Sequence, residues 1–83
     1  MKASYDPSQC GATISYTLTD SRKVHLNVFD QQGRNVAAIV DNVVAAGRHR
    51  AFWKASRVPA GMYVWQMTVD GRNAGSGRIV VGR

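Results

Sequence analysis

Apolar and polar residues alternate along much of this chain, which is the pattern of a β-strand with one buried face. The first alternating segment runs from Thr13 to Leu18, and the second runs from Lys23 to Phe29. The apolar face of these two segments comprises Ile14, Tyr16, Leu18, Val24, Leu26 and Val28. Residues 19–22 and 30–33 contain Asp, Ser and Gly, so each strand is expected to end in a turn.

The second half of the chain repeats this alternation. Residues 47–54 form one alternating segment, and Met62 to Val69 are apolar on both faces, as expected of a central strand. Asp70-Gly71 predicts a tight hairpin, and a return strand is expected from about Gly77 to Val81. Turn residues at intervals of roughly 8 to 12 residues are typical of a β-sandwich. The predicted fold is therefore all-β, an immunoglobulin- or fibronectin-III-like sandwich of about seven short antiparallel strands.

Residues 36–46 fit two different structures. Apolar residues recur there at the spacing of an amphipathic helix: Val36, Ile39, Val40, Val43 and Val44. The segment is also rich in β-branched residues, and Asp41-Asn42 is typical of a turn, which favours two short strands. The pattern of residues alone leaves both structures open.

The chain is expected to form a single domain. Its 83 residues are the length of one small domain, and a chain of this size buries about 60% of its unfolded surface. Residues 1–12 lack periodicity and contain the breakers Pro7 and Gly11, so we expect a lead-in segment followed by a sandwich domain over residues 13–83. Cys10 is the only cysteine, which excludes an internal disulfide and a cysteine-based zinc site.

Sequence motifs for catalysis or metal binding are missing. The chain contains no phosphate-binding loop, no nucleophile elbow and no dinucleotide fingerprint. His25 and His49 lie on different predicted strands, without the spacing of a ligand pair. Four of the five acidic residues sit at predicted turns and are explained as turn formers: Asp20, Asp30, Asp41 and Asp70. We therefore expect no enzymatic activity and no metal or other cofactor.

Charge is unevenly balanced, with 11 Lys and Arg residues against 5 acidic residues and a net charge of +6. No long run of basic residues occurs, and no nucleic-acid partner is expected. One face of a predicted strand carries a basic stripe with an aromatic residue: Arg48, Arg50, Phe52 and Lys54. Two interpretations stay open, a surface that binds an anionic polymer or an outward face kept soluble by its charges.

The aromatic residues divide by strand parity. Trp53, Tyr63 and Trp65 share the inward parity of their strands and are expected in the core. If they were exposed, the two tryptophans would instead offer platforms for stacking sugars. Phe29 and Phe52 have the opposite parity and are the aromatic residues expected at the surface.

Several segments in a fixed order resemble a known family. They are Ile14-Ser15-Tyr16-Thr17-Leu18, Val24-His25-Leu26-Asn27-Val28-Phe29-Asp30, Gly33-Arg34, Ala45-Ala46-Gly47-Arg48-His49, Trp53 and Pro59-Ala60-Gly61-Met62-Tyr63. In this order they resemble the C-terminal immunoglobulin-like sorting domains of type IX secretion cargo, which are similar to the Ig-like domain of the flagellar hook-cap protein. The resemblance covers roughly residues 7–83.

The resemblance implies a role and a set of structural and recognition residues. Residues 36–46 would be extended, and Gly61 and Tyr63 would be structural positions alongside Trp53 and Trp65. The domain would end a secreted bacterial protein, signal its sorting and anchor it at the cell surface. Its partners would be secretion-machinery proteins at the outer membrane, with Arg78 and Arg83 on the final strand as recognition residues.

A second function belongs to a different class. Related Ig-like domains serve as binding or spacer modules of secreted polysaccharide-degrading enzymes, so a polysaccharide is the alternative ligand. Both functions place the domain outside the cell or on its surface, as a monomeric part of a larger protein. No stretch of about 18 apolar residues occurs, so no insertion into a membrane is expected.

Overall fold

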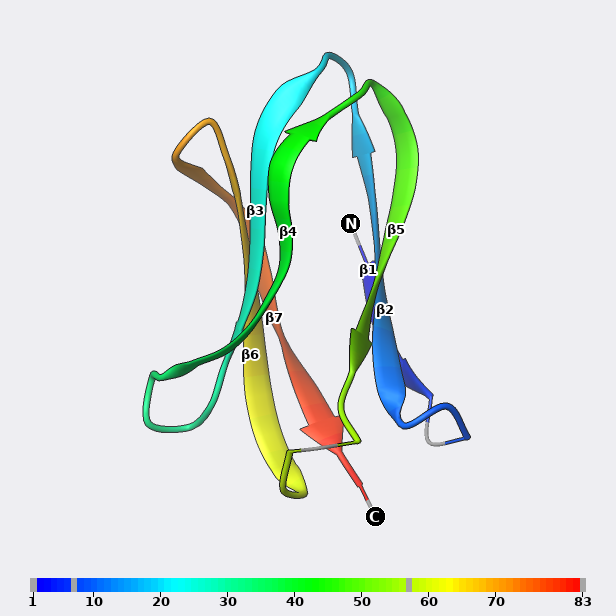
Figure 1. The fold of residues 1–83 in the computed structure, drawn as a ribbon, viewed down its shortest axis with the longest axis vertical. Coiled ribbons are helices and arrows are strands. Elements are labelled where there is room, and N and C mark those ends of the chain that lie inside the picture. The colour runs from blue at the N-terminus through cyan, green and yellow to red at the C-terminus, as the bar shows by residue number, and fades with distance from the viewer. Residues whose placement is uncertain (1, 7, 57, 83) are drawn as a thin grey trace.

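The protein folds as two antiparallel β-sheets that pack face to face (Figure 1). A computed structural model describes residues 2–6, 8–56 and 58–82, and the described residues contain strands and no helix. The strands are β1 (Lys2–Asp6), β2 (Gly11–Leu18), β3 (Arg22–Phe29), β4 (Asn35–Val44), β5 (Gly47–Lys54), β6 (Gly61–Val69) and β7 (Arg72–Val81). The predicted all-β sandwich is confirmed.

The strand order defines the type of sandwich. One sheet has the order β1-β2-β5 and the other has the order β4-β3-β6-β7, and all neighbouring strands are antiparallel. In a constant-type immunoglobulin domain the fourth strand joins the sheet of the first strand. Here β4 stays beside β3, which gives the three-plus-four division of a fibronectin-III-like sandwich. The strand predicted to be central, β6, lies between β3 and β7.

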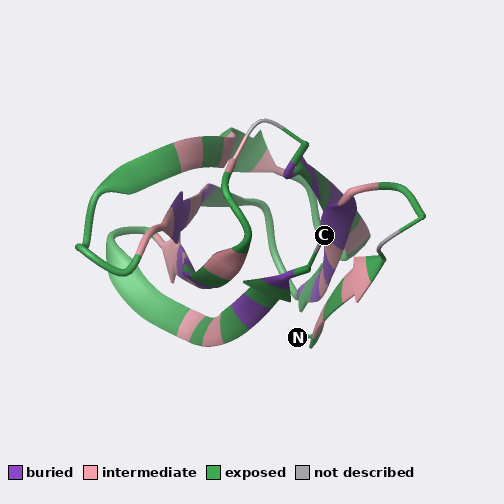
Figure 2. Ribbon diagram, turned by 90° about the horizontal axis from the view of Figure 1, so that it is seen from below, coloured by how far each residue is buried: buried purple, intermediate pink, exposed green. Residues whose placement is uncertain are grey.

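The core lies between the sheets and is built from alternate residues of their strands (Figure 2). Every inward residue predicted for β2 and β3 is buried, and so are Trp53, Tyr63 and Trp65. The Trp53 and Tyr63 rings come from opposite sheets and meet edge to face, with ring centres 5.3 Å apart. Because each tryptophan is only about 5% exposed, neither can serve as a sugar-stacking platform.

Three local features surround the aromatic residues of the core. The hydroxyl of Tyr63 donates a hydrogen bond of 2.6 Å to the carbonyl of Pro59, four residues earlier, which is the tyrosine corner of such sandwiches. Gly61 begins β6 with φ of 151°, a conformation that favours glycine. A Cβ atom at Gly77 on β7 would lie 2.5 Å from Nε1 of Trp65, so the indole fills the space above this glycine.

Residues 35–44 form one continuous strand, β4. The extended conformation expected from the resemblance is therefore confirmed, and the alternative of an amphipathic helix is wrong. The turn considered at Asp41-Asn42 is also absent, because Asp41 pairs with His25 and Asn42 pairs with Val24 in the middle of the ladder.

The register of β4 with β3 shifts at two places, and the first of these β-bulges accounts for part of the helical spacing. Leu26 pairs with Val40 and the next residue of β3 pairs with Ala38, so Ile39 is an extra residue in β4. Neighbouring residues on one face of a regular strand are two positions apart in the sequence. Where a bulge inserts one extra residue, the same two residues are three positions apart. The partly buried residues Ala37 and Val40 are consequently three apart, as on one face of a helix.

The structure differs from the sequence-based expectation at both ends of the chain. Residues 2–6, expected as part of a lead-in, form β1 and pair with β2 from Lys2 opposite Ser15 to Asp6 opposite Gly11. The return strand β7 begins at Arg72, earlier than expected, directly after the hairpin. Asp70 and Gly71 both have positive φ, 52° and 81°, which confirms the predicted tight turn.

Candidate functional site

Groups that could perform catalysis or bind a metal are dispersed over the described residues. His25 lies on β3 with Nε2 2.8 Å from Oδ1 of Asp41, whereas His49 lies on β5 with Nε2 2.6 Å from the carbonyl oxygen of Ala45. No group of three or more His, Cys, Asp or Glu residues is placed to hold a metal ion in the described part of the chain. Across residues 2–6, 8–56 and 58–82 there is no helix of the length and apolarity needed to cross a membrane.

The aspartates are engaged in local contacts, four of them in turns or ladders of the four-stranded sheet. Asp20 and Asp70 pair with Arg22, at 3.1 and 3.0 Å, and Asp41 contacts Lys23 and His25. Asp30 pairs with Arg34 at 3.0 Å within the β3–β4 turn. The fifth, Asp6 at the end of β1, accepts hydrogen bonds from the hydroxyl and the backbone N–H of Ser8.

Hydrogen bonds lower the pKa of three of these carboxyl groups. The pKa of Asp30 is below its usual range mainly because the backbone N–H of Arg34 donates to it. The pKa of Asp70 is lowered first by the backbone N–H of Lys23 and then by the guanidinium of Arg22. The pKa of Asp6 is lowered by the hydroxyl of Ser8. The carboxylates of these three aspartates accept hydrogen bonds that stabilise the adjacent turns.

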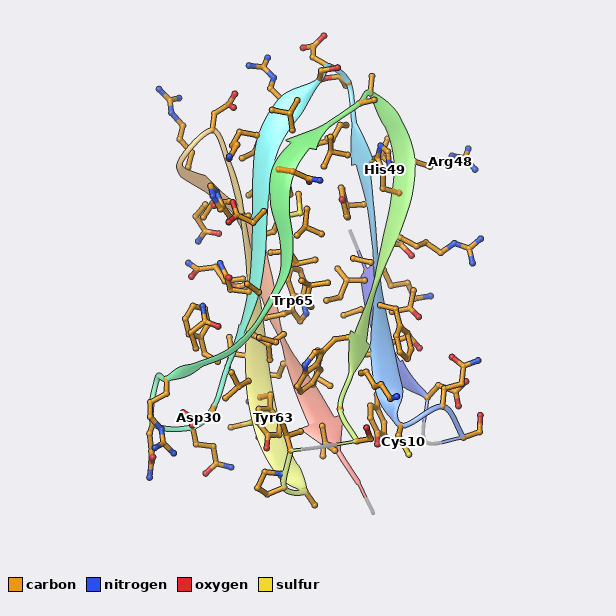
Figure 3. All side chains as sticks on the ribbon, viewed as in Figure 1. Cys10, Asp30, Arg48, His49, Tyr63 and Trp65 are labelled. Atoms are coloured by element: carbon orange, nitrogen blue, oxygen red, sulfur yellow. The ribbon has the colours of Figure 1, made fainter. Side chains whose placement is uncertain are left out.

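The predicted basic stripe lies on the outer face of the three-stranded sheet. The side chains of Arg48, Arg50, Phe52 and Lys54 are exposed on β5, and Figure 3 shows Arg48 pointing away from the other sheet. The strand register adds a column of hydroxyl groups from β2 and one further cation from β1. We call this surface the basic face; its members are Lys2, Ser4, Asp6, Thr13, Ser15, Thr17, Arg48, Arg50, Phe52 and Lys54, with Asp6 as its one carboxylate.

Among the described residues, no acidic side chain forms an ion pair with the four cations of the basic face. Two open hollows on this face share Lys2, Ser15 and Arg50 in their linings, so they form one trough across the sheet. Ser15 stands between Lys2 and Arg50 in the register, with one cation on each side of it.

Phe52 is the exposed aromatic residue of the basic face. Its side chain is 46% exposed, as its outward parity predicts. Its ring covers Gly11 on the neighbouring strand, because a Cβ atom at Gly11 would collide with the tip of that ring. This packing holds the ring in place across β2, with part of its surface open to solvent.

A different surface forms around the edge strand β7. Arg78 and Val80 are exposed on the outer face of the four-stranded sheet, because the intervening Ile79 is buried. Their neighbours on β6 and β3 are apolar. We call this surface the β7 patch; its members are Phe29, Met62, Val64, Arg78 and Val80. Arg83, the other predicted recognition residue, lies outside the described residues.

Sequence reasoning found parts of both surfaces and missed others. It named the β5 residues because they alternate along one strand, and it named Arg78 from the resemblance. Lys2 and Ser15 join the basic face only through pairing between distant strands, which alternation within one strand does not reveal. Met62 and Val64 form the second apolar face of residues 62–69. In the sequence, this face indicates a central position of the strand and does not by itself indicate an exposed binding surface.

A third hollow lies between the β3–β4 turn and the segment that joins β5 to β6. Its lining includes Asp30, Arg34, Pro59 and Tyr63. The two charged groups are paired with each other and the Tyr63 hydroxyl is bonded to Pro59, so these polar groups are already satisfied by contacts within the protein.

Comparison of the chain with protein-family models, with curated proteins and with solved structures finds no match. The two surfaces and the resemblance of the sequence segments are therefore the features that bear on function.

Proposed function

We propose that this protein is a non-catalytic sorting and cell-surface anchoring domain of a secreted bacterial protein. In this proposal β7 is the element that secretion-machinery proteins at the outer membrane recognise. The observation that carries the proposal is the coincidence of an open sheet edge, an exposed apolar patch and a cation on one strand.

The edge of β7 supplies the first part of a recognition surface. An edge strand presents unpaired backbone N–H and C=O groups, to which a partner strand can add. β7 is the last strand of its sheet, and its end is tied to β1 by a hydrogen bond of 3.2 Å from the Tyr5 hydroxyl to the carbonyl of Gly82. This contact fixes the position of the edge relative to the other sheet.

The β7 patch supplies the second part. Val80 is 65% exposed, and Met62, its cross-strand partner on β6, is also exposed. Burial of apolar surface by a partner releases about 25 cal/mol per Å², and aromatic and methionine side chains are enriched in interfaces. Arg78, beside Val64 in the register, adds a guanidinium that can bind a carboxylate with two hydrogen bonds.

The structure also dictates how the proposal must be tested. A deletion of residues 79–83 would remove Ile79 and Val81, which are both buried in the core, and would damage the fold itself. Arg78 and Val80 face outward on the same strand, so their substitution changes the surface and leaves the core intact.

The test is export of a reporter fused in front of this domain, in a host that has the type IX machinery. We expect the double variant Arg78→Glu/Val80→Asp to lower export at least about tenfold, the factor for each loss of about 1.4 kcal/mol in binding. The matched control is Arg48→Gln/Arg50→Gln on the opposite sheet, which should export normally. Circular dichroism and thermal unfolding establish that both variants are folded.

Two results would overturn the proposal. One is normal export of the folded Arg78→Glu/Val80→Asp variant, and the other is retention of the reporter that carries the unaltered domain. Either result would favour the accessory-module function in place of sorting.

A further inference from the structure

We propose that the basic face binds an acidic polysaccharide, a sugar chain that bears carboxylate or sulfate groups. This surface lies on the outer side of the sheet opposite to the β7 patch. The inference therefore goes beyond the proposed sorting function, and neither requires the other.

The distribution of charge is the first argument. The chain has 11 Lys and Arg residues against 5 acidic residues, and four of the acidic residues contact cations of the four-stranded sheet and its turns. Asp6 is the one acidic residue of the basic face: it lines the trough with Lys2 and Arg50, and its carboxylate accepts hydrogen bonds from Ser8. The four cations of the basic face outnumber this single carboxylate, and an excess of positive charge on one side of a protein produces a positive potential that attracts anions.

The spacing of the cations is the second argument. Arg48, Arg50 and Lys54 face outward along β5, and a strand rises about 3.3 Å per residue, so they span roughly 20 Å. Lys2 lies two strands away from β5, at a distance of about 10 Å given the usual separation of strands. Cations spread in this way along a line suit an extended polymer with repeated negative charges and not a single small anion.

The hydroxyl column is the third argument. Thr13, Ser15 and Thr17 face outward on β2. In the register, Ser15 pairs with both Lys2 and Arg50, and Thr17 lies beside Arg48. Each hydroxyl can both donate and accept a hydrogen bond, as sugar hydroxyl groups do. Ser15 lies in the lining of both hollows of the trough, between Lys2 and Arg50. The trough therefore offers cations for acidic groups and hydroxyls for the sugar rings between them.

The aromatic residues distinguish this ligand from a nucleic acid. Sites for single-stranded nucleic acids stack successive bases on several exposed aromatic rings. Phe52 is the one aromatic member of the basic face, and its ring is already packed over Gly11. Both tryptophans are buried, so a neutral polysaccharide would find no indole platform either. The groups that the basic face presents to a ligand are therefore mainly cations and hydroxyl groups.

The experiment measures binding of the whole chain to four polymers by isothermal titration calorimetry. The acidic polysaccharides are heparin, which bears sulfate groups, and polygalacturonate, which bears only carboxylates. Neutral dextran and a single-stranded DNA oligonucleotide complete the set. We expect binding to at least one acidic polysaccharide that weakens as salt is added, because exposed charges are screened.

Two double variants separate the basic face from the total charge. Arg48→Gln/Arg50→Gln should weaken polysaccharide binding at least about tenfold. Arg34→Gln/Arg72→Gln removes the same number of charges from exposed positions of the four-stranded sheet and its turn, and should change binding less than about twofold. Ser15→Ala should weaken binding by a smaller factor if the hydroxyl column contacts the sugar.

The proposal is overturned if neither acidic polysaccharide binds or if both double variants weaken binding equally, which would leave only a net-charge effect. It is also overturned if dextran binds as tightly as the acidic polysaccharides. A further contrary result is that DNA binds more tightly than both acidic polysaccharides and that neither heparin nor polygalacturonate displaces it. A normal export phenotype for Arg48→Gln/Arg50→Gln has no bearing on this result, so failure of binding and failure of sorting are distinguishable.

Discussion

The two sheets have similar inner faces and very different outer faces. Inward residues on both sheets are apolar or aromatic and are buried in one shared core. On the outside, the three-stranded sheet carries cations without an ion-pair partner among the described residues, together with hydroxyl groups, whereas the four-stranded sheet carries the apolar β7 patch and ion pairs such as Lys23–Asp41. The same alternation of residues thus produces one interior and two chemically distinct surfaces.

This difference indicates where stability and recognition reside. Residues on inner faces are constrained by close packing, because any change of volume there is costly. Residues on outer faces contribute little to stability, so their chemistry is free to serve binding. The three predictions below test this division, in order of decreasing effect on the free energy of unfolding.

The largest effect is expected from Trp53, which joins the two sheets in the core. Trp53→Ala should lower the free energy of unfolding by about 3–5 kcal/mol, because it removes a large buried side chain that packs against Tyr63. Urea unfolding followed by circular dichroism measures the loss. The adjacent variant Phe52→Ala alters an aromatic residue of the outer face and should cost less than half as much; an equal cost would contradict the division.

The fold was predictable from sequence wherever one face of a strand is buried without interruption. β2, β3 and β5 largely alternate between apolar and polar residues, whereas β6 is apolar on both faces; in all four strands the inward residues named from the sequence are buried. β1 was missed because its only large inward side chain is Tyr5, and that residue is merely half-buried at the edge of a sheet. A short edge strand such as β1 can be identified only from its pairing with a neighbouring strand, and that pairing is seen only in the folded protein.

The ambiguity of β4 has a different origin. The extra residue Ile39 shifts the alternation by one position, and the result cannot be distinguished from a helix by spacing alone. The candidate surfaces show the same limit. Arg48 and Arg50 could be named from one strand, but the contribution of Lys2 depends on a register between strands that a linear pattern does not contain.

An intermediate effect is expected from the hydroxyl groups of two tyrosines that differ in burial. Tyr63 donates to Pro59 at the tyrosine corner inside the sandwich, and Tyr5 donates to Gly82 at its exposed edge. Tyr63→Phe should lower the free energy of unfolding by about 1 kcal/mol, since the Pro59 carbonyl loses its partner in a partly buried site. Thermal unfolding would show a smaller effect for Tyr5→Phe, whose carbonyl partner can bond to water; the reverse order would contradict the prediction.

The smallest effect is expected in acid, and it arises from turns of the four-stranded sheet. The pKa values of Asp30 and Asp70 are lowered in the folded protein by backbone N–H groups and by arginine. A carboxyl group with a lowered pKa contributes stability above its unfolded-state pKa and loses it as pH falls through the folded-state pKa. Urea unfolding should therefore show stability declining from about pH 5 towards about pH 2.

The variant Asp30→Asn/Asp70→Asn tests this cause. It should be less stable than the unaltered protein at neutral pH, and the two proteins should become equally stable in acid, because protonation removes the same charges. If the difference in free energy of unfolding between the two proteins did not change with pH, the acid sensitivity would have to arise from another group, such as Asp6 of the other sheet, whose pKa is lowered by Ser8.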